Sequence, residues 1–500
     1  TYVQADGSQQ TVLGEIADDT WVRNARLKDM GITPVASGGL DRVLIKRGNR
    51  QISGQDFAWY WQGQLQNVQW PADVVVLERR EWGNFYGRLA ALKENGQPIA
   101  AGADALVALY PRLERALDLL DQVRAIEKGE MDALNYRLEK LRLQQRRLEL
   151  KGNVSPEALA DLEAERAEIH RQFEVLQQQI GELTTQANRD TAVLQTIDGT
   201  EKELSLAKIV KVTQPNAMSV GQKIVEYGHR FVDFLKDDPR ESNTEGGIFP
   251  AIFGTVLMVL IMSIIVTPFG VVTAVYLREY AKQGWLTRTI RIAVNNLAGV
   301  PSIVYGVFGL GFFVYFLGAG IDRIFYPEAL PAPVFGTPGL MWASITLAIL
   351  TVPVVIVATE EGLARIPRSV REGSLALGAT KFETLWRVVL PMSSPAMMTG
   401  LILAIARAAG EVAPLMLVGV VKLAPTLPID GNAPFLHMER KFMHLGFHIF
   451  DVGFQSPNVE AAQPLVYATA FLLVLVIALL NLSAVLIRNN LRERYRALET

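Results

Sequence analysis

The sequence predicts a mainly α-helical protein in which a polytopic membrane bundle is joined to a separate α+β domain with an antiparallel coiled-coil hairpin. The first observation is that charge is distributed unevenly between the two halves of the chain. Residues 1–245 hold 31 Lys+Arg and 37 Asp+Glu, whereas residues 246–500 hold 18 and 14, so the net charges are −6 and +4. Apolar runs in the second half exceed the ~18 residues that mark a spanning helix. A leucine-rich helical stretch in the first half is the third observation.

Residues 1–217 are expected to form the separate domain, built from short strands and one helical hairpin at about 111–190. Turn residues predict β-hairpins over 41–52, around Gly48-Asn49, and over 192–212, around Asp198-Gly199. The second helix of the long hairpin has apolar residues in the alternation of three and four that forms a coiled-coil seam, with one exception, the charged Arg166 between Leu162 and Ile169. They are Leu159, Leu162, Ile169, Phe173, Leu176, Ile180 and Leu183.

Residues 218–247 are expected to be an interfacial helix and a linker, because apolar and charged side chains alternate over 219–236. A transmembrane domain then covers 248–487 and a short tail covers 488–500. Its five spans are expected at about 248–277, 292–321, 339–359, 392–421 and 461–487. Only the fourth contains charged residues, Arg407 and Glu411.

Loop charges predict the orientation of the spans. Thirteen of the 18 basic residues in the second half follow the first, third and fifth spans, and four lie in the two alternate loops. The positive-inside rule then predicts a multi-pass membrane protein with a cytoplasmic C-terminus and with the domain 1–217 outside. Such a domain needs a route across the membrane. We therefore expect a sixth spanning helix before Thr1, with a cleaved signal peptide as the alternative.

The most specific pattern lies in the loop 361–391. It reads Arg371-Glu372-Gly373-Ser374-Leu375-Ala376-Leu377-Gly378, then nine residues, then Val388-Val389-Leu390-Pro391. This resembles the loop shared by the membrane permeases of ABC importers: Glu-Ala-Ala, three residues, Gly, nine residues, a branched aliphatic, one residue, Leu-Pro. Gly373 and Ser374 stand where the family has two alanines.

Small side chains in this loop allow a short helix to approach a partner closely, and Gly378 allows the chain to break. A second helix over 381–389 is expected to end at Leu390-Pro391. The resemblance implies that the first helix is the coupling helix moved by an ATPase subunit. The residues assigned to this coupling are Arg371, Glu372, Gly373, Ser374, Ala376, Gly378, Lys381 and Phe382.

Stretches 247–255, 300–306 and 406–414 are similar to the A-type permease subunits of phosphate ABC importers, and the similarity covers about residues 218–500. It implies the fold of type I importer permeases, with residues 1–215 inserted between the family's first two spans. It further implies a bacterial inner membrane, with the domain 1–217 in the periplasm. It also implies a second homologous permease, two ATPase copies that carry ATP and Mg²⁺, and a periplasmic phosphate-binding protein. The chain itself has no Gly-Lys dipeptide, and hence no phosphate-binding loop, so we expect no enzymatic activity and no bound cofactor.

Arg407 and Glu411 are the candidate substrate residues, since an Arg inside a span is costly and normally faces a pathway. Its planar guanidinium suits the phosphate oxyanion; the alternative is an ion pair that only fixes packing. Asn295, Asn296, Ser302 and Tyr305 are further candidates for the pathway. Asn295-Asn296 and Pro301 together indicate a broken helix.

Other classes fit less well. The near-neutral net charge of the chain offers no broad basic surface for nucleic acid, and the absence of Cys excludes thiol chemistry. His444 and His448 have a metal-compatible spacing near Asp451, but no Cys or close third ligand completes a set, so no metal is expected. For the loop that also holds His437, we expect a short outside helix. Two alternatives stay open: a permease for molybdate, phosphonate or another oxyanion, and a signalling or structural membrane protein that uses the hairpin.

Overall fold

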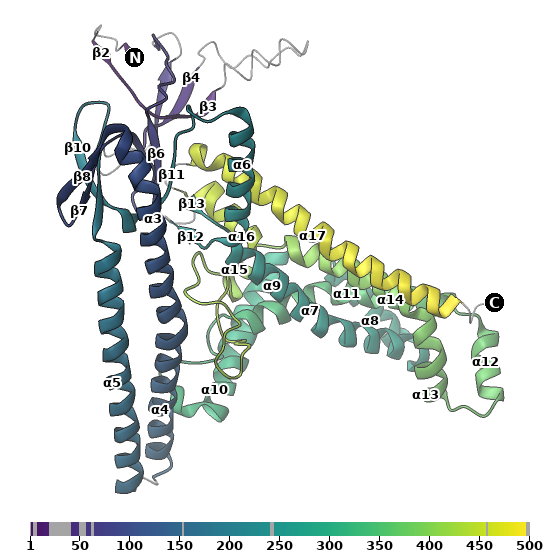
Figure 1. Cartoon of the computed structure of the whole chain (residues 1–500). Helices are drawn as coiled ribbons and strands as arrows, with labels where there is room; N and C mark the ends of the chain where they lie inside the picture. The colour runs from purple at the N-terminus through teal and green to yellow at the C-terminus, as the bar shows by residue number, and fades with distance from the viewer. Residues whose placement is uncertain are drawn as a thin grey trace, which may run out of the picture. The chain divides into compact units, whose positions relative to one another are not determined.

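The computed structural model describes residues 2–3, 8–19, 42–49, 57–61, 65–152, 155–240, 245–456 and 459–496. The chain divides into two compact units (Figure 1). The first comprises Thr1–Gly247 with Pro457–Gln463, and the second comprises Ile248–Ser456 with Pro464–Thr500.

An antiparallel sheet forms the centre of the first unit, with strand order β10-β9-β7-β6-β11 and β8 beside β7. Its strands are β6 (Val75–Arg79), β7 (Phe85–Glu94), β8 (Gln97–Ala101), β9 (Asp190–Gln195), β10 (Glu201–Ser205) and β11 (Ile209–Thr213). Glu201 pairs with Gln195, so the predicted turn at Asp198-Gly199 is present. The hairpin ends at Ser205, because β11 pairs with β6 instead.

A second, three-stranded sheet contains β3 (Glu15–Asp19), β4 (Arg42–Lys46) and β5 (Phe57–Trp61). The hairpin predicted around Gly48-Asn49 is wrong as a pairing, because β4 pairs with β5; residues 50–52 lie outside the described residues. Asn49 supplies the physical reason. Its side chain donates to the Tyr86 carbonyl at 3.0 Å and accepts from the Tyr86 amide at 3.2 Å. These bonds hold Asn49 against β7, and β3 and β5 occupy both edges of β4.

Two short pairs complete the strands of this unit that the structure describes. These are β1 (Tyr2–Val3) with β2 (Gln9–Gln10), and β12 (Pro239–Arg240) with β13 (Glu245–Gly246). The amphipathic helix α6 (Val220–Lys236) lies between β11 and β12 in the chain.

A long helical hairpin projects from the main sheet (Figure 1). One arm runs through α3 (Gly102–Ala125), a π-helical turn at Ile126–Met131, and α4 (Asp132–Leu150). The other arm is α5 (Pro156–Ala187), whose first turn is capped by the Ser155 hydroxyl, an acceptor for the Ala158 amide at 3.1 Å. The hairpin therefore starts nine residues earlier than predicted, because Pro111 is accommodated inside the helix.

The seam predicted from the leucine pattern is the core of this hairpin, which confirms the coiled-coil part of the predicted fold. Its fully buried residues are Ile126, Leu134, Leu141, Ile169 and Leu176. The partly buried residues packed against them include Leu138, Leu162, Phe173, Ile180 and Leu183. Near the sheet, α3 buries Ala105, Leu109 and Leu113 in the core of the domain.

Ile169→Ala is expected to loosen the hairpin, because Ile169 has no exposed surface and its loss leaves a cavity between the arms. Such truncations cost about 2–5 kcal/mol. Hydrogen exchange of the α5 amides in the full-length protein in lipid nanodiscs measures the change as faster exchange. Val175→Ala on the exposed side of α5 is the matched control and leaves the rates unchanged. Equal exchange in both variants would contradict this description of the seam.

The second unit is a helical bundle. Its helices are α7 (Phe249–Val275), α8 (Trp285–Leu297), α9 (Ser302–Phe308), α10 (Ala319–Phe325), α11 (Leu340–Arg365), α12 (Arg368–Ala376), α13 (Lys381–Thr384), α14 (Leu390–Gly410), α15 (Leu415–Val418), α16 (Leu445–Phe450) and α17 (Val459–Arg496). π-helical turns continue α7 to Tyr280, join α9 to α10 and join α13 to α14.

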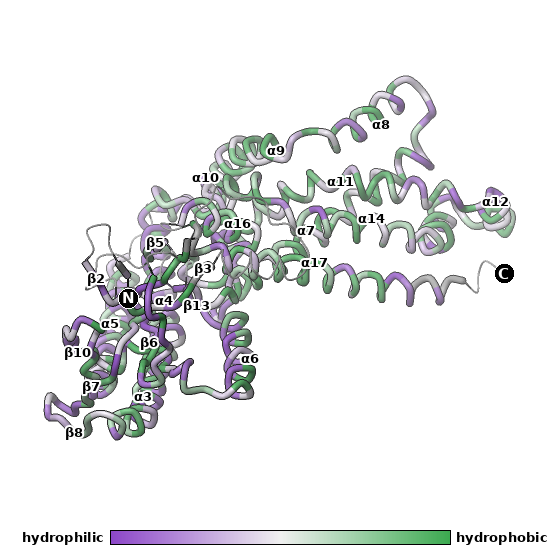
Figure 2. Tube along the Cα trace, turned by 90° about the horizontal axis from the view of Figure 1, so that it is seen from above, coloured by the Kyte–Doolittle hydropathy of each residue, from purple (hydrophilic) through white to green (hydrophobic). Residues whose placement is uncertain are grey.

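Five helices among the described residues are long and apolar enough to cross a membrane, and Figure 2 shows their hydrophobic colouring. They are Phe249–Tyr280, Ser302–Phe325, Leu340–Arg365, Lys381–Gly410 and Ala462–Asn490. The number of spans is as predicted. The helix α11 lies at the centre, where Leu347 and Leu350 pack with Met258 of α7 and Ala404 of α14.

Two predicted span boundaries are wrong. The second span begins at Ser302, not 292, because α8 ends at Leu297 and the chain breaks before Pro301, which cannot donate the next hydrogen bond. The fourth span covers 381–410, not 392–421, since the helix runs through Pro391 and ends at Gly410. The fifth span, at Ala462–Asn490, agrees with the predicted 461–487, and its helix continues to Arg496.

Candidate functional site

The pair Arg407–Glu411 lies at the end of α14. Arg407 is in the last turn and Glu411 is the first residue beyond the helix, with an extended backbone. Arg407 Nε lies 3.8 Å from Glu411 Oε1, and the two side chains keep 31% and 21% of their surface exposed. The expected ion pair is therefore present, although its partners do not share one helical face. Partial exposure leaves the guanidinium accessible to an anion.

Tyr305 lies at the break in the second span. It is a buried residue of α9, and its hydroxyl donates to the Leu297 carbonyl at 2.7 Å, across the break between α8 and α9. Its ring belongs to the same buried core as Ala404 and Ala408, which are near Arg407 in α14. The break predicted from Asn295-Asn296 and Pro301 is thus present and held by a side chain.

The other pathway candidates are less closely connected. Asn295 and Asn296 are exposed on the last turn of α8, and Ser302 is the half-buried first residue of α9. Within the described residues, none of the three forms a hydrogen bond to Arg407 or Glu411. Arg407 and Glu411 are therefore the candidates that the structure brings into contact, and Tyr305 lies in the core that packs against the same helix.

The loop predicted to couple to an ATPase forms a two-helix turn of α12 and α13. Gly378 has φ +89°, a left-handed conformation that favours glycine, and it ends the first helix. Thr380 begins the second: its hydroxyl accepts from the Glu383 amide at 3.2 Å and Glu383 Oε2 accepts from the Thr380 amide at 2.9 Å. The hydroxyls of Ser374 and Thr384 lie 2.9 Å apart and link the helices.

Arg371 and Lys381 bind the end of α7. Arg371 donates to Glu279 Oε1 at 3.0 Å and to the carbonyl oxygens of Leu363 and Ile366 at 2.8 and 2.7 Å. Lys381 donates to the Glu279 carbonyl and lies 4.5 Å from the centre of the Tyr280 ring. These two cations therefore anchor the turn to the bundle, and their predicted role in ATPase coupling stays a prediction.

The outward surface of this turn is apolar at its tip. Leu377 is 91% exposed, and Phe382 stacks on Trp386 with ring centres 6.3 Å apart while both rings stay exposed. Leu375 is exposed as well. We call Leu375, Leu377, Phe382 and Trp386 the coupling patch. Sequence reasoning named only Phe382; the signal for the others was the presence of large apolar residues on both sides of Gly378.

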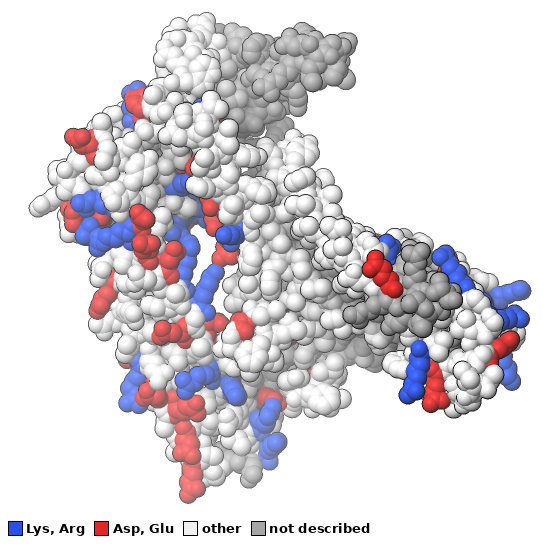
Figure 3. All heavy atoms as spheres, turned by 45° about the vertical axis from the view of Figure 1, so that its right-hand side comes forward, with Lys and Arg blue, Asp and Glu red and all other residues white. Residues whose placement is uncertain are grey.

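Exposed Glu372, Gly373 and Ala376 lie beside the coupling patch, in α12. Figure 3 shows Lys and Arg side chains gathered at this end of the bundle, while the visible faces of the spans are nearly free of charge.

The predicted helix end at Leu390-Pro391 is wrong. The π-helical turn at Leu385–Val389 widens the helix ahead of Pro391, and α14 continues from it.

The three histidines of the loop 422–460 lie in surroundings typical of residues that stabilise a fold. His437 lies between Asp430 and Glu439, at 3.0 and 3.1 Å from its two ring nitrogens, so the carboxylates are on opposite sides of the ring. Burial lowers the pKa of His444 to about 3 and that of His448 to about 4, so both are neutral at physiological pH. Among the described residues no group of His, Cys, Asp or Glu is arranged to hold a metal ion. The expected short helix is α16.

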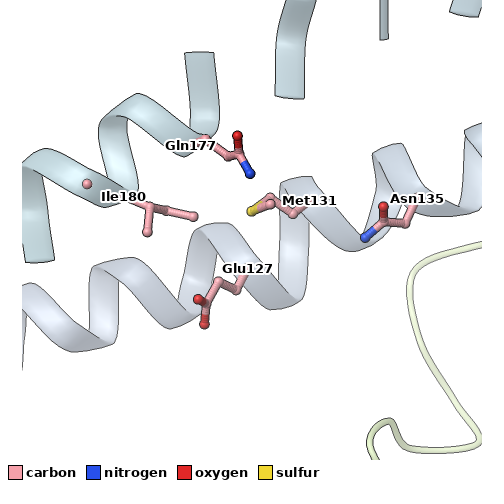
Figure 4. Close-up of a pocket in the computed structure, with 6 residues that line it drawn as sticks. Glu127, Met131, Asn135, Gln177 and Ile180 are labelled. Atoms are coloured by element: carbon pink, nitrogen blue, oxygen red, sulfur yellow. The ribbon is translucent and has the colours of Figure 1, made fainter. Parts of the chain in front are cut away.

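The helical hairpin of the first unit carries an open groove beside its π-helical turn (Figure 4). Glu127, Met131, Asn135, Gln177, Ile180 and Gly181 line it. A methyl group at Gly181 would meet no atom within 4 Å, so the small residue and the widened turn leave this space between the arms. The groove contains one carboxylate and two amides but no nucleophile–base pair.

Comparison with known proteins places the bundle in a family. Residues 266–497 match the family described as binding-protein-dependent transport system inner membrane component. The chain is 34% identical over 245 residues to phosphate transport system permease protein PstA 1 of Mycobacterium tuberculosis (strain ATCC 25618 / H37Rv), covering 49% of this chain and 70% of that protein. It is 33% identical over 252 residues to phosphate transport system permease protein PstA of Yersinia pestis, covering 50% of this chain and 75% of that protein.

A third relative is the probable ABC transporter permease protein YqgH of Bacillus subtilis (strain 168), 31% identical over 205 residues. The match covers 40% of this chain and 61% of YqgH. All three similarities thus extend over at most half of this chain. The chain belongs to the family of phosphate transport system permease proteins, which are inner membrane components of binding-protein-dependent transport.

Proposed function

We propose that this chain is the permease subunit of an ATP-driven phosphate importer and forms half of its translocation pathway. The observation that carries the proposal is the coupling patch on a turn that Arg371 and Lys381 fix to α7. Exposed apolar side chains on a rigid, charged end of a membrane bundle are typical of a protein interface. The names of the relatives support phosphate as the substrate.

The partners follow from this assignment. A homologous second permease completes the pathway, two copies of an ATPase subunit bind beneath the two permeases, and a periplasmic phosphate-binding protein delivers the substrate. ATP and Mg²⁺ are bound by the ATPase subunits, and this chain carries out no covalent chemistry. Closure of the ATPases moves α12, which is joined through Glu279 to α7, and opens the bundle outward. Hydrolysis of ATP then resets it.

The excess of Lys and Arg near α12, α13 and the end of α17 supports an orientation with these ends in the cytoplasm. The same orientation makes the first unit periplasmic. Its acidic charge would repel phosphate, so we propose that the helical hairpin contacts a protein of the importer.

Arg407 is proposed to bind the phosphate oxyanion during passage, because a guanidinium forms charge-assisted hydrogen bonds with phosphate oxygens. Glu411 holds Arg407 between cycles and accepts a hydrogen bond from protonated phosphate. Sulfate has no proton to donate at neutral pH, so the carboxylate repels it. Tyr305 holds the break between α8 and α9 through its hydrogen bond to the Leu297 carbonyl.

Leu377→Asp tests the assignment. A carboxylate at the most exposed position of the coupling patch is expected to prevent binding of the ATPase, because the interface would bury an unpaired charge. Copurification of the ATPase with the membrane-inserted variant measures this. Leu423→Asp, at an exposed leucine of the loop 422–460, is the control and keeps the ATPase bound. If the Leu377 variant also retains the ATPase and transports phosphate normally, the proposed coupling surface is wrong.

A further inference from the structure

The helix α6 (Val220–Lys236) has an unusual arrangement for a helix on a folded domain. It begins with a capping box, in which the Gln222 amide donates to the Ser219 hydroxyl and the Ser219 amide donates to Gln222 Oε1 at 2.8 Å. Its apolar side chains recur at the spacing of one helical face, and its charged ones occupy the opposite face. None of its residues is buried.

The charged face is the one turned toward the domain. Lys211 of β11 lies 3.0 Å from Glu226 and 3.4 Å from Asp233, and Arg230 lies 3.0 Å from Glu226. Burial raises the pKa of Glu226, but the hydrogen bonds from Lys211 and Arg230 outweigh it and keep this pKa below its ordinary value. The ion pairs therefore persist at neutral pH and fix the rotation of the helix.

The apolar face over 220–232 is consequently turned away from the domain, whereas Phe234 and Leu235 in the last turn are half-buried. Ile224 is 68% exposed and Tyr227 is 76% exposed. The other exposed apolar residues of this helix are Val220, Val225, Phe231 and Val232. A soluble amphipathic helix has the opposite orientation, with its apolar stripe against the core. This face therefore requires another apolar surface.

The chain after α6 identifies that surface. Asp237 caps the helix, and a methyl group on Gly247 would lie 2.2 Å from the Asp237 carbonyl oxygen, so the two backbones are in contact. The Gly247 amide also donates to the Asp238 carbonyl at 3.1 Å, which closes the β12–β13 ladder. The next residue, Ile248, precedes the first spanning helix, α7. The last turn of α6 therefore lies where the chain enters the bilayer.

We propose that α6 lies in the surface of the lipid bilayer, with the face of Ile224, Tyr227 and Phe231 among the headgroups and upper acyl chains. Amphipathic helices bind membranes in this way, and tyrosine is enriched at the same depth. The ion pairs with Lys211 then join this helix to the sheet of the first unit. This role is independent of the substrate and of the ATPase.

The absence of Cys from the chain allows a direct test with single-cysteine variants of the full-length protein. Ile224→Cys and Phe231→Cys place an environment-sensitive fluorophore on the apolar face, and His229→Cys places it on the exposed polar face of the same helix. Glu165→Cys, exposed on α5, serves as the water-facing reference. The protein is reconstituted in phosphatidylcholine–phosphatidylglycerol vesicles with and without lipids nitroxide-labelled near the headgroup. Aqueous iodide is the second quencher.

We expect labels at 224 and 231 to be blue-shifted, strongly quenched by nitroxide lipid and several-fold less sensitive to iodide than labels at 229 and 165. Two results would overturn the proposal. Iodide sensitivity at 224 and 231 equal to that at 165 would show that water covers the face. Shielding from both quenchers would show that protein covers it. Because the readout uses neither transport nor ATP, it does not depend on the function proposed above.

Discussion

Replacement of Arg407 by alanine is expected to reduce phosphate uptake about ten- to hundredfold. The pair with Glu411 leaves part of the guanidinium exposed, so Arg407 can exchange its carboxylate partner for the oxyanion. Hydrogen bonds to charged groups contribute about 1.5–3 kcal/mol, and each 1.4 kcal/mol is about tenfold in an equilibrium constant. Uptake of radiolabelled phosphate into proteoliposomes that contain the whole importer measures the loss.

Two further variants at this pair separate charge from geometry. Arg407→Lys keeps the charge but loses the planar fork, so uptake is expected to recover only in part. Glu411→Gln removes the repulsion of a fully ionised anion, so sulfate should begin to compete with phosphate. Arg323→Ala, at an exposed cation of α10, is the matched control and leaves uptake unchanged. Normal phosphate uptake by both Arg407 variants in correctly assembled importers would show that the Arg407–Glu411 ion pair only fixes helix packing.

The coiled-coil seam and the number of spans could be predicted from sequence because both depend on local periodicity and composition. Ile169 and Leu176 are buried as their spacing requires. The positive φ of Gly378 likewise fits the break expected there. In each case, residues close together in the chain determine the result.

The predictions are wrong where the structure depends on contacts between residues that are far apart in the sequence. Hydropathy placed the second span across Pro301, although the chain breaks there and Tyr305 holds the break with a hydrogen bond to Leu297. It also excluded the charged segment 381–391 from the fourth span, since no composition shows that a π-helical turn will carry the helix through Pro391. Turn statistics likewise cannot predict the hydrogen bonds of Asn49 with Tyr86, which lies 37 residues later in the chain.

The same limitation applies to Arg371, which sequence analysis assigned to the ATPase surface. Its partners Glu279 and Leu363 belong to the ends of α7 and α11, so its role appears only in the folded bundle. The motif identifies the loop but does not distinguish the residues that hold it against the bundle from those that are exposed on its surface.

Arg371→Ala is therefore expected to uncouple ATP hydrolysis from transport. The substitution removes three hydrogen bonds and leaves the Glu279 carboxylate without this cation. At about 1.5–3 kcal/mol for a bond to a charged group, α12 should detach from α7 for a substantial part of the time. ATPase activity of the purified importer should persist while phosphate uptake falls by at least about tenfold. Both rates are measured on the same proteoliposomes.

Measuring phosphate uptake and ATP hydrolysis together distinguishes two roles of Arg371, anchoring of α12 to α7 and direct contact with the ATPase. If Arg371 bound the ATPase itself, its loss would reduce copurification and hydrolysis together, as expected for Leu377→Asp. Arg371→Lys retains a charge near Glu279 but cannot reach both carbonyl oxygens in the same geometry, so its uptake should lie between those of wild type and alanine. Arg365→Ala, at the exposed end of α11, removes an equivalent cation without an anchoring bond and should transport normally. Uptake and hydrolysis that fall in parallel in Arg371→Ala would contradict the anchoring role, because a loosened α12 lowers transport per ATP and not the rate of hydrolysis.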